Sequence, residues 1–216
     1  MTVVFLHALP LDERMWPAGV EAPRLYGLGR TMDEWGHAVI EAYPGPLIVV
    51  GASMGGYCAM AAARLAPERI AGLVLAGSRP DADSPSRRAG RAETIALARA
   101  RGADGIWEAM RERLFTPETD PVLIKRMRPI ALDRTEEELV TALEAIRDRP
   151  DSTAAYAALG DRALTIVGDS DPFVPVADAR GFDPEAVVLP ACGHLPSLDR
   201  PAEFNVVLAE AVARWR

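Results

Sequence analysis

The sequence has few of the residues that build metal sites, disulfide scaffolds and nucleic-acid surfaces. Its 216 residues include two cysteines and three histidines, and 24 basic residues stand against 31 acidic ones, for a net charge of −7. Cys58 and Cys192 form no C-x-x-C or Cys/His ligand spacing, so neither a zinc site nor a disulfide scaffold is predicted, although one buried disulfide stays open. The acidic balance leaves no basic footprint for nucleic acid or anionic lipid. We therefore expect a small molecule as the partner.

Long apolar runs are also lacking. No stretch approaches the ~20 apolar residues of a membrane span. The first residues, MTVVFLHALP, have no basic leader, and their apolar run is too short for a signal peptide. We therefore expect a cytoplasmic protein that does not bind membranes. The hydrophobic fraction of 49% and the charged fraction of 25% are typical of a globular protein, and the length suits one domain or one domain with an insertion.

Five short segments have the pattern of buried strands. Each is continuously apolar rather than alternating, which is what a strand covered on both faces requires. They run from Val3 to Leu6, Leu47 to Val50, Ile70 to Ala76, Ala163 to Val167 and Ala186 to Leu189, and a weaker sixth runs from Ala22 to Tyr26. Helical patterns cover Met32 to Ala42, Met54 to Ala66 and Ala202 to Trp215. Strands that alternate with helices predict an α/β protein whose parallel sheet carries helices on both faces.

The interval 79–159 breaks this alternation, because it holds no convincing strand and is rich in Arg, Glu, Ala and Leu. Thr135 and Glu138 have the spacing of a capping box, and Leu139, Leu143 and Ile146 then recur on one helical face. We predict a helical cap insertion over 79–159 in a core made of residues 1–78 and 160–216.

The stretch LIVVGASMGG, residues 47–56, is the most informative one. A buried strand there ends in G-x-S-x-G, and an Ala-rich helix follows, which is the arrangement of a nucleophile elbow around Ser53. The glycines prevent clashes where the strand and the helix approach each other. Met54 would offer its N–H at the helix start, where the helix dipole favours negative charge, as one donor of an oxyanion hole. A plain glycine turn is the alternative.

A serine hydroxyl needs a base to become a nucleophile. His194 follows the last strand in a Gly-containing loop, so we predict it as the base; a loop histidine bonded to the backbone is the alternative. His37 lies in the middle of a helix and is predicted as a surface or half-buried helix residue, while His7 closes the first strand. The base needs a carboxylate that fixes its tautomer. The strand that ends in ALTIV is followed by GDSDPFVP, which brings both Asp169 and Asp171 to the same edge of the sheet.

Four motifs in this order resemble the α/β-hydrolase superfamily, and within it the small bacterial carboxylesterases and 3-oxoadipate enol-lactonases. They are FLHALPLDERMW (the oxyanion loop, 5–16), GASMGG (the elbow, 51–56), GDSDPFVP (the acid turn, 168–175) and CGHLPSLDRP (the histidine loop, 192–201). The resemblance implies that Asp171 is the acid of the triad and that the backbone N–H of Leu9 is the second oxyanion donor. It also implies a reduced, mostly parallel sheet of about six strands, because the initial antiparallel strands of the family are missing here.

One departure from the family is Ala8, since the usual pattern after the histidine of the oxyanion loop is glycine. Alanine resists positive φ, which leaves the placement of the Leu9 amide open. We predict that His7 is structural and holds this loop, and that Cys58 and Cys192 are small core residues. Trp16, Trp35, Trp107 and Met54 could line a pocket or be plain core.

These observations predict a serine hydrolase that cleaves small carboxylic esters or lactones through an acyl-enzyme on Ser53, with Asp171 and His194 as partners and without a cofactor or metal. Related proteins use the same triad for C–C bond hydrolysis or as perhydrolases, and a ligand receptor with little turnover is the alternative of another class. Cap arginines invite the idea of a clamp for a substrate carboxylate, against the plainer alternative of solvated helix faces. The arginines considered are Arg87, Arg91, Arg126 and Arg128. The oligomeric state is left open.

Overall fold

The computed structural model describes all residues from 1 to 216, and a single parallel sheet lies at its centre. The strands are β1 (Thr2–Leu6), β2 (Leu47–Ala52), β3 (Ile70–Ala76), β4 (Ala163–Gly168) and β5 (Val187–Leu189). They lie side by side in chain order, and each neighbouring pair is parallel. The predicted α/β class and parallel sheet are confirmed, with five strands in place of about six.

The segment expected as a sixth strand, Ala22 to Tyr26, does not form one. Glu21 makes an isolated bridge to Val4 at the outer edge of β1, and the pairing stops there. Pro23 has no N–H to donate to a ladder, and the Leu25 N–H donates to a histidine side chain instead of a strand. The prediction of a strand here is wrong because these backbone groups are not free to pair.

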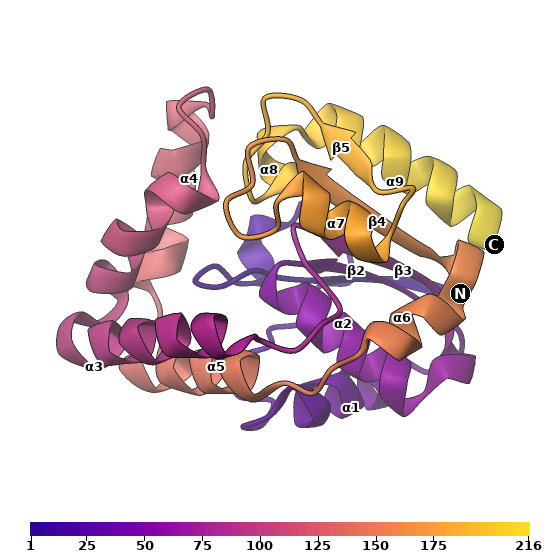
Figure 1. Cartoon of the computed structure of the whole chain (residues 1–216), viewed down its shortest axis with the longest axis horizontal. Helices are drawn as coiled ribbons and strands as arrows, with labels where there is room; N and C mark the ends of the chain where they lie inside the picture. Colours follow the sequence, from indigo (N-terminus) through magenta and orange to yellow (C-terminus); the bar gives the residue numbers. More distant parts are fainter.

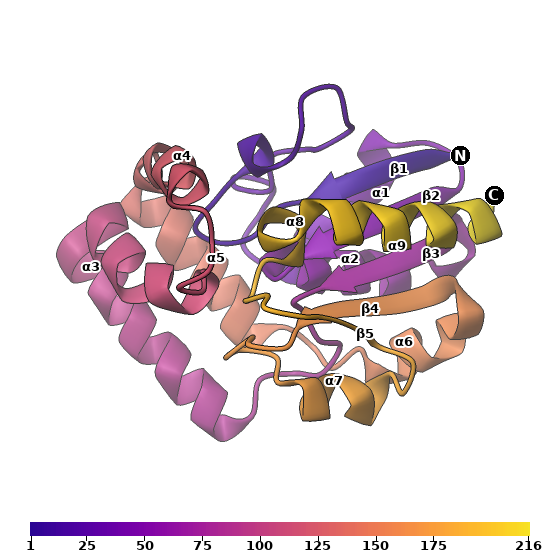
Figure 2. The same cartoon turned by 90° about the horizontal axis from the view of Figure 1, so that it is seen from above.

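Helices cover both faces of the sheet and the carboxyl ends of its strands. They are α1 (Met32–Ala42), α2 (Met54–Leu65), α3 (Pro85–Leu114), α4 (Pro121–Leu132), α5 (Glu136–Asp148), α6 (Thr153–Leu159), α7 (Val176–Phe182), α8 (Pro196–Asp199) and α9 (Pro201–Trp215). Short 3-10 turns lie at Glu13–Met15, Pro67–Arg69 and Gly160–Arg162. α1 and α2 lie on one face and α9 on the other (Figures 1 and 2). None of these helices combines the length and the apolar character that crossing a bilayer requires.

Two apolar cores, one on each face of the sheet, explain why the strand sequences are continuously apolar and do not alternate between apolar and polar residues. Val49 and Leu73 point into the core that α1, α2, α3 and α5 share, while their neighbours Val50 and Val74 point into the core beneath α4 and α9. All four of these side chains are fully buried. β2, which is covered on both faces, carries no polar side chain, and this matches its sequence pattern.

The interval 79–159 contains α3 to α6 and no strand. α3, α4 and α5 stand beyond the carboxyl ends of the strands, as the view from above shows (Figure 2). The predicted capping box is present at the start of α5, where Thr135 and Glu138 exchange hydrogen bonds with each other's backbone N–H. The apolar face of the same helix is buried, with Leu143 fully so. α6 packs against α2 of the core.

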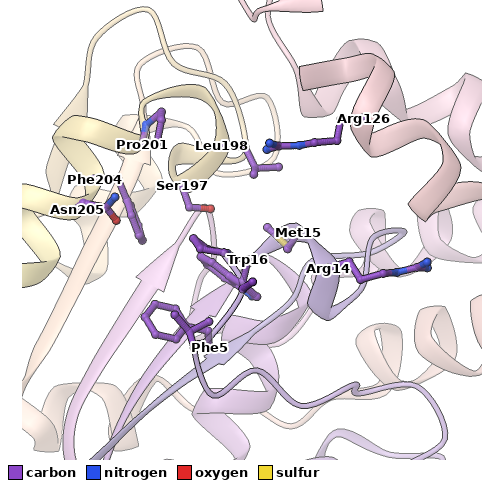
Figure 3. A pocket seen from close by; sticks show the side chains of 13 residues that line it. Phe5, Arg14, Met15, Trp16, Arg126, Ser197, Leu198, Pro201, Phe204 and Asn205 are labelled. Atoms are coloured by element: carbon purple, nitrogen blue, oxygen red, sulfur yellow. The ribbon is translucent and has the colours of Figure 1, made fainter. Parts of the chain in front are cut away.

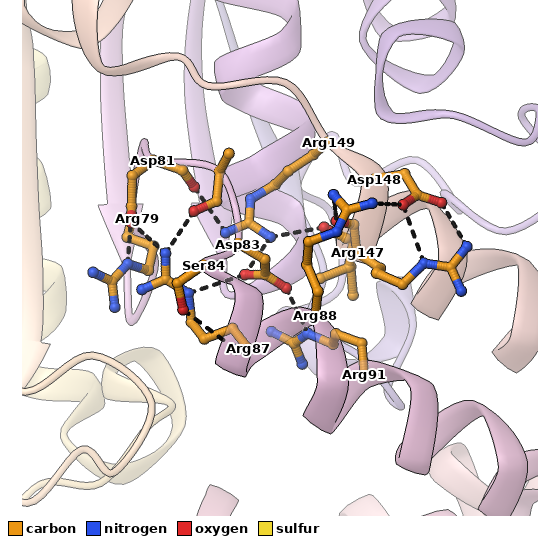
Figure 4. Close-up of polar contacts among 12 residues, drawn as sticks. Arg79, Asp81, Asp83, Ser84, Arg87, Arg88, Arg91, Arg147, Asp148 and Arg149 are labelled. Carbon is orange, nitrogen blue, oxygen red and sulfur yellow. Dashed lines mark hydrogen bonds and ion pairs between the residues drawn. The ribbon is translucent and has the colours of Figure 1, made fainter.

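An ion-pair network joins the two chain segments that enter and leave this helical region (Figure 4). At its centre, the fully buried carboxylate of Asp83 contacts Arg149 at 2.8 Å, and Arg87 and Arg91 at 3.2 Å each. Arg149 thereby ties the exit of α5 to the entry of α3. The backbone adds a further link, because the Ser152 N–H donates to the Pro80 carbonyl at 3.0 Å.

Replacing Asp83 should destabilise the fold, because its loss leaves the buried Arg149 and the partly buried Arg91 without a counter-charge. We expect Asp83→Ala to lower the free energy of unfolding by about 3–5 kcal/mol, the usual cost of breaking a buried ion pair from one side. Urea unfolding measures this change. The matched control is Asp104→Ala, because Asp104 pairs with Arg128 at 3.4 Å on the surface, where both side chains are more than half exposed. Equal effects of the two variants would contradict a structural role for the buried network.

Candidate active site

Ser53 occupies the sharp turn between β2 and α2. Its φ of 49° and ψ of −111° are a conformation that side-chain-bearing residues rarely adopt. The backbone around it is fixed, since the Ser53 N–H donates to the Ala76 carbonyl at 2.8 Å and the Ser53 carbonyl accepts from the Ser78 hydroxyl at 2.8 Å. Strain of this kind is held only where the surrounding structure imposes it, and it concentrates at functional sites.

The two glycines of G-x-S-x-G are required by close packing. A Cβ at Gly55 would lie 2.2 Å from the Leu6 carbonyl oxygen of the neighbouring strand. A Cβ at Gly51 would lie 2.5 Å from the Gly55 carbonyl oxygen. Neither distance is possible for a real side chain, so this turn can form only with glycine on both sides of Ser53.

Residues from three distant segments meet above this turn. The Nε2 atom of His194 lies 2.8 Å from Ser53 Oγ, and its Nδ1 atom lies 2.9 Å from Asp171 Oδ2 and 3.0 Å from Oδ1. A carboxylate accepts hydrogen bonds, so Nδ1 is the donor to Asp171; in the neutral imidazole this leaves the lone pair of Nε2 facing the serine hydroxyl. The structure therefore brings the three predicted residues together in the order serine, histidine and carboxylate.

Asp171 is held from both sides. Its carboxylate is fully buried, and Oδ1 also accepts the N–H groups of Phe173 at 2.8 Å and Val174 at 3.1 Å. The Phe173 ring packs against the imidazole of His194 with 4.5 Å between ring centres. The aspartate thus caps its own turn and contacts the histidine at the same time.

Asp169 lies at the same sheet edge but takes another role. Its carboxylate is exposed and accepts the N–H groups of Ala191 at 3.0 Å and Cys192 at 3.2 Å. These two backbone bonds, that of Cys192 first, hold the pKa of Asp169 below its usual value. Asp169 therefore links the acid turn to the histidine loop two residues before His194, and it makes no contact with the imidazole.

The two predicted oxyanion donors are the backbone N–H groups of Met54 and Leu9. Met54 is the first residue of α2, where an N–H has no partner within its own helix. Leu9 is buried, and its N–H donates no hydrogen bond to another part of the chain. Ser53 and Ala191 are the two residues other than glycine with positive φ. Ala8 therefore forms its part of the loop without the strain that its side chain would meet in the left-handed region.

The oxyanion loop is held by buried polar contacts. His7 is fully buried and accepts the Leu25 N–H at Nε2, 2.9 Å away. Burial lowers the pKa of His7 to about 4, so the ring is neutral near pH 7 and works as a structural link. Asp12 contacts Arg14 at 2.6 Å and Arg134 at 2.8 Å, and Arg134 belongs to the segment between α4 and α5. The loop is thus tied both to the core and to the helices beyond the strand ends.

The remaining candidates from the sequence lie away from this site or in the core. His37 is exposed on α1, 3.3 Å from Glu41. Cys58 and Cys192 are buried free thiols without a disulfide, and burial raises the pKa of Cys192 to about 12. Trp35 and Trp107 are core residues with at most 1% exposure. No group of three or more His, Cys, Asp or Glu side chains is placed to hold a metal ion.

Trp16 lines a cavity of about 440 Å³ beside the oxyanion loop (Figure 3). Phe5 and Phe204 form its apolar wall, and Arg126 of α4 points toward it from the far side. Ser53 does not line this cavity. Trp16 therefore lines a pocket, which is one of the two roles considered for it from the sequence, but this pocket is separate from the serine turn.

Sequence reasoning missed Asp199, which holds the histidine loop from behind. Its Oδ2 accepts the Gly193 N–H at 2.8 Å, one residue before His194, and its Oδ1 accepts the Thr119 hydroxyl at 2.8 Å. Burial raises the pKa of this carboxyl group above its usual value. The short stretch PSLDRP that contains Asp199 gave no reason to expect a contact with residue 119, eighty positions away in the chain.

Comparison with known proteins agrees with this geometry. The model of the alpha/beta hydrolase family matches residues 3–207. A pimeloyl-[acyl-carrier protein] methyl ester esterase of Aromatoleum aromaticum is 27% identical in an alignment of 252 positions, gaps included, that covers 97% of each chain.

Solved structures show the same fold. A thermophilic esterase of Thermogutta terrifontis, solved with malate bound, is 28% identical with a TM-score of 0.89 and covers 100% of this chain and 90% of its own. The enol-lactonase of Burkholderia xenovorans LB400 is 20% identical with a TM-score of 0.84 and covers 98% of this chain and 91% of its own.

Proposed function

Because the chain belongs to the alpha/beta hydrolase family, we propose that it is a serine hydrolase that cleaves small carboxylic esters or lactones through an acyl-enzyme on Ser53. The observation that carries this proposal is the hydrogen-bonded chain from Ser53 through His194 to Asp171, with 2.8 Å and 2.9 Å between its members. The similarity to two esterases, each above 25% identity over nearly the whole chain, supports an ester as the substrate.

The proposed reaction begins with proton transfer from Ser53 Oγ to His194 Nε2 while Oγ attacks the ester carbonyl carbon. The N–H groups of Leu9 and Met54 donate to the resulting oxyanion. The tetrahedral intermediate then breaks its bond to the alcohol oxygen, which takes the proton from His194. Water enters, gives a proton to His194 and attacks the acyl carbon. Ser53 leaves with that proton, and the carboxylic acid is released.

We further propose that residues 79–159 form the cap of this site, with α3, α4 and α5 over the strand ends. Their position beyond the carboxyl ends of the parallel strands supports this, because ligands of open α/β sheets bind there. A cap at this place would select substrates through the side chains that it presents to Ser53. The cytoplasmic location expected from the sequence stays a prediction.

Two alternatives differ in what they predict for turnover. A receptor of the same fold would bind a ligand with little hydrolysis, whereas the complete hydrogen-bonded triad favours an enzyme. A C–C bond hydrolase or a perhydrolase would use the same triad on another substrate. A screen of 4-nitrophenyl acetate, 4-nitrophenyl butyrate and γ-lactones, together with fluorophosphonate labelling of Ser53, separates an esterase or lactonase from a receptor. Labelling without turnover of any ester or lactone would favour the receptor.

Asp199 should act as a positioning residue in this reaction. Asp199→Ala removes the acceptor of the Gly193 N–H, so the histidine loop loses its support next to His194. We expect kcat for ester hydrolysis to fall by about 10- to 100-fold, as small misplacements of catalytic groups do, with little change in KM. We also expect a loss of about 1–3 kcal/mol in the free energy of unfolding, because a buried N–H stays unpaired.

The control is Thr119→Val, which removes the other hydrogen bond of the same carboxylate and leaves the Gly193 contact in place. This variant should keep kcat close to that of the unmodified protein. A normal kcat of folded Asp199→Ala, measured well below its melting temperature, would show that the contact is only structural.

A further inference from the structure

Most arginines of the cap are neutralised by carboxylates. Of those considered from the sequence as a carboxylate clamp, Arg87 and Arg91 contact Asp83, and Arg128 contacts Asp104. Within 79–159, the arginines whose side chains make no hydrogen bond or ion pair within the chain are Arg101, Arg113 and Arg126. A guanidinium that has kept its donors free can bind an anion from outside.

Arg113 is the member of this set beside the triad. It lies in the last turn of α3, and its Cζ atom stands 4.0 Å from the ring centre of Phe173. The same ring packs against the imidazole of His194 at 4.5 Å. One aromatic ring therefore separates the guanidinium from the proposed catalytic base. Arg126 lines the separate cavity beside the oxyanion loop, which does not include Ser53.

The charge of Arg113 has no partner in its surroundings. Burial and the nearby Arg91 lower the pKa of Arg113, and Asp171 is the carboxylate that acts in the opposite direction. Asp171 makes no ion pair with Arg113, and its two oxygens already accept hydrogen bonds from His194, Phe173 and Val174. The surroundings thus leave a net positive charge at this point, which a bound anion would relieve.

We propose that Arg113 binds a carboxylate of the substrate, so that the site hydrolyses esters or lactones that carry a second, free carboxylate. This inference rests on the proposed function and names the substrate class of the same site. Stacking on Phe173 holds the guanidinium plane while its N–H edge stays available, and that edge fits a carboxylate in a two-point contact. Phe173 also touches His194, so the ring sets the position of the clamp relative to the base.

The first test compares esters that differ only in the second carboxylate. Monomethyl esters of succinic, glutaric and adipic acid are set against methyl butyrate, valerate and hexanoate. We expect kcat/KM for the best monomethyl ester to exceed that of its neutral counterpart at least tenfold. The preference should fall at high salt because the contact is partly exposed to solvent. A preference for the neutral esters would overturn the proposal.

The second test uses variants of Arg113 on the same pairs of esters. Arg113→Gln should lose at least tenfold more kcat/KM on the monomethyl ester than on the neutral one, and Arg113→Lys should keep part of the preference as a point charge. The controls are Arg111→Gln, which changes a residue paired with Glu108 on the same helix, and Arg126→Gln. Both controls should keep the preference. Its loss in Arg126→Gln, with retention in Arg113→Gln, would assign the clamp to the other cavity.

A binding measurement separates this proposal from the proposed function. Calorimetric titration with glutarate should detect binding to the unmodified protein and at least tenfold weaker binding to Arg113→Gln, whether or not any ester is hydrolysed. Glutarate binding without turnover would support the clamp and contradict the hydrolase. Turnover of neutral esters without glutarate binding would support the hydrolase and overturn the clamp.

Discussion

Ser53→Ala should lower kcat for ester hydrolysis by at least about 10⁴-fold, because no other group in the structure is placed to accept the acyl group. His194 and Asp171 would keep their hydrogen bond, but His194 Nε2 would face a methyl group instead of a hydroxyl. The melting temperature should stay the same or rise slightly, because strained nucleophiles are held at some cost in stability. Steady-state kinetics and thermal unfolding of the two proteins measure both effects.

The matched control is Ser86→Ala, since Ser86 is an exposed serine in the first turn of α3. This variant should keep full activity. If Ser53→Ala kept most of the kcat of the unmodified protein, the assignment of the nucleophile would be wrong.

Asp171→Asn should have the second-largest effect, a fall in kcat on the order of 10⁴-fold, as in the serine-protease template. An amide can donate to Nδ1 of His194, which favours the tautomer whose proton lies on Nε2 and which cannot accept the serine proton. The fold should persist, because the amide oxygen can still accept the N–H groups of Phe173 and Val174. Measuring kcat and melting temperature together separates the loss of the tautomer from a loss of structure.

Asp169→Asn is the comparison that makes this result specific. Asp169 holds the backbone of Ala191 and Cys192, and an asparagine oxygen can keep one of these contacts. We expect a loss of less than about tenfold in kcat, because the imidazole keeps its carboxylate. A large loss at Asp169 together with a near-normal rate at Asp171 would mean that the acid is assigned two residues too late.

The strands and the serine turn could be predicted from short sequence patterns, because each depends mainly on residues that are close together in the chain. The continuous apolar strands required cover on both faces, and the structure provides a separate core on each face. The G-x-S-x-G spacing predicted a turn that admits no Cβ at Gly51 or Gly55, and the structure confirms this close packing. The predicted meeting of Ser53 and His194 is also present, while their catalytic roles stay predictions.

The features that the sequence did not reveal depend on partners far away in the chain. The sixth strand has suitable composition, but Pro23 and the hydrogen bond from Leu25 to a histidine remove the backbone groups that pairing needs. Asp199 supports the histidine loop and contacts Thr119, which no short-range pattern connects. Arg113 differs from most other cap arginines because it has no carboxylate partner. This difference depends on tertiary contacts, which no local pattern of the sequence reveals.

The proposed acyl-enzyme on Ser53 is tested most directly by the mass of the protein during turnover. Acid quenching within the first turnovers of 4-nitrophenyl acetate, followed by mass spectrometry of the intact chain and its peptides, would trap a covalent intermediate. If Ser53 is the nucleophile, one acetyl group per chain will be found on the peptide that contains Ser53, and none in Ser53→Ala. Turnover at the full rate with no acyl group on the chain, or with the acyl group on another residue, would contradict the proposed acyl-enzyme on Ser53.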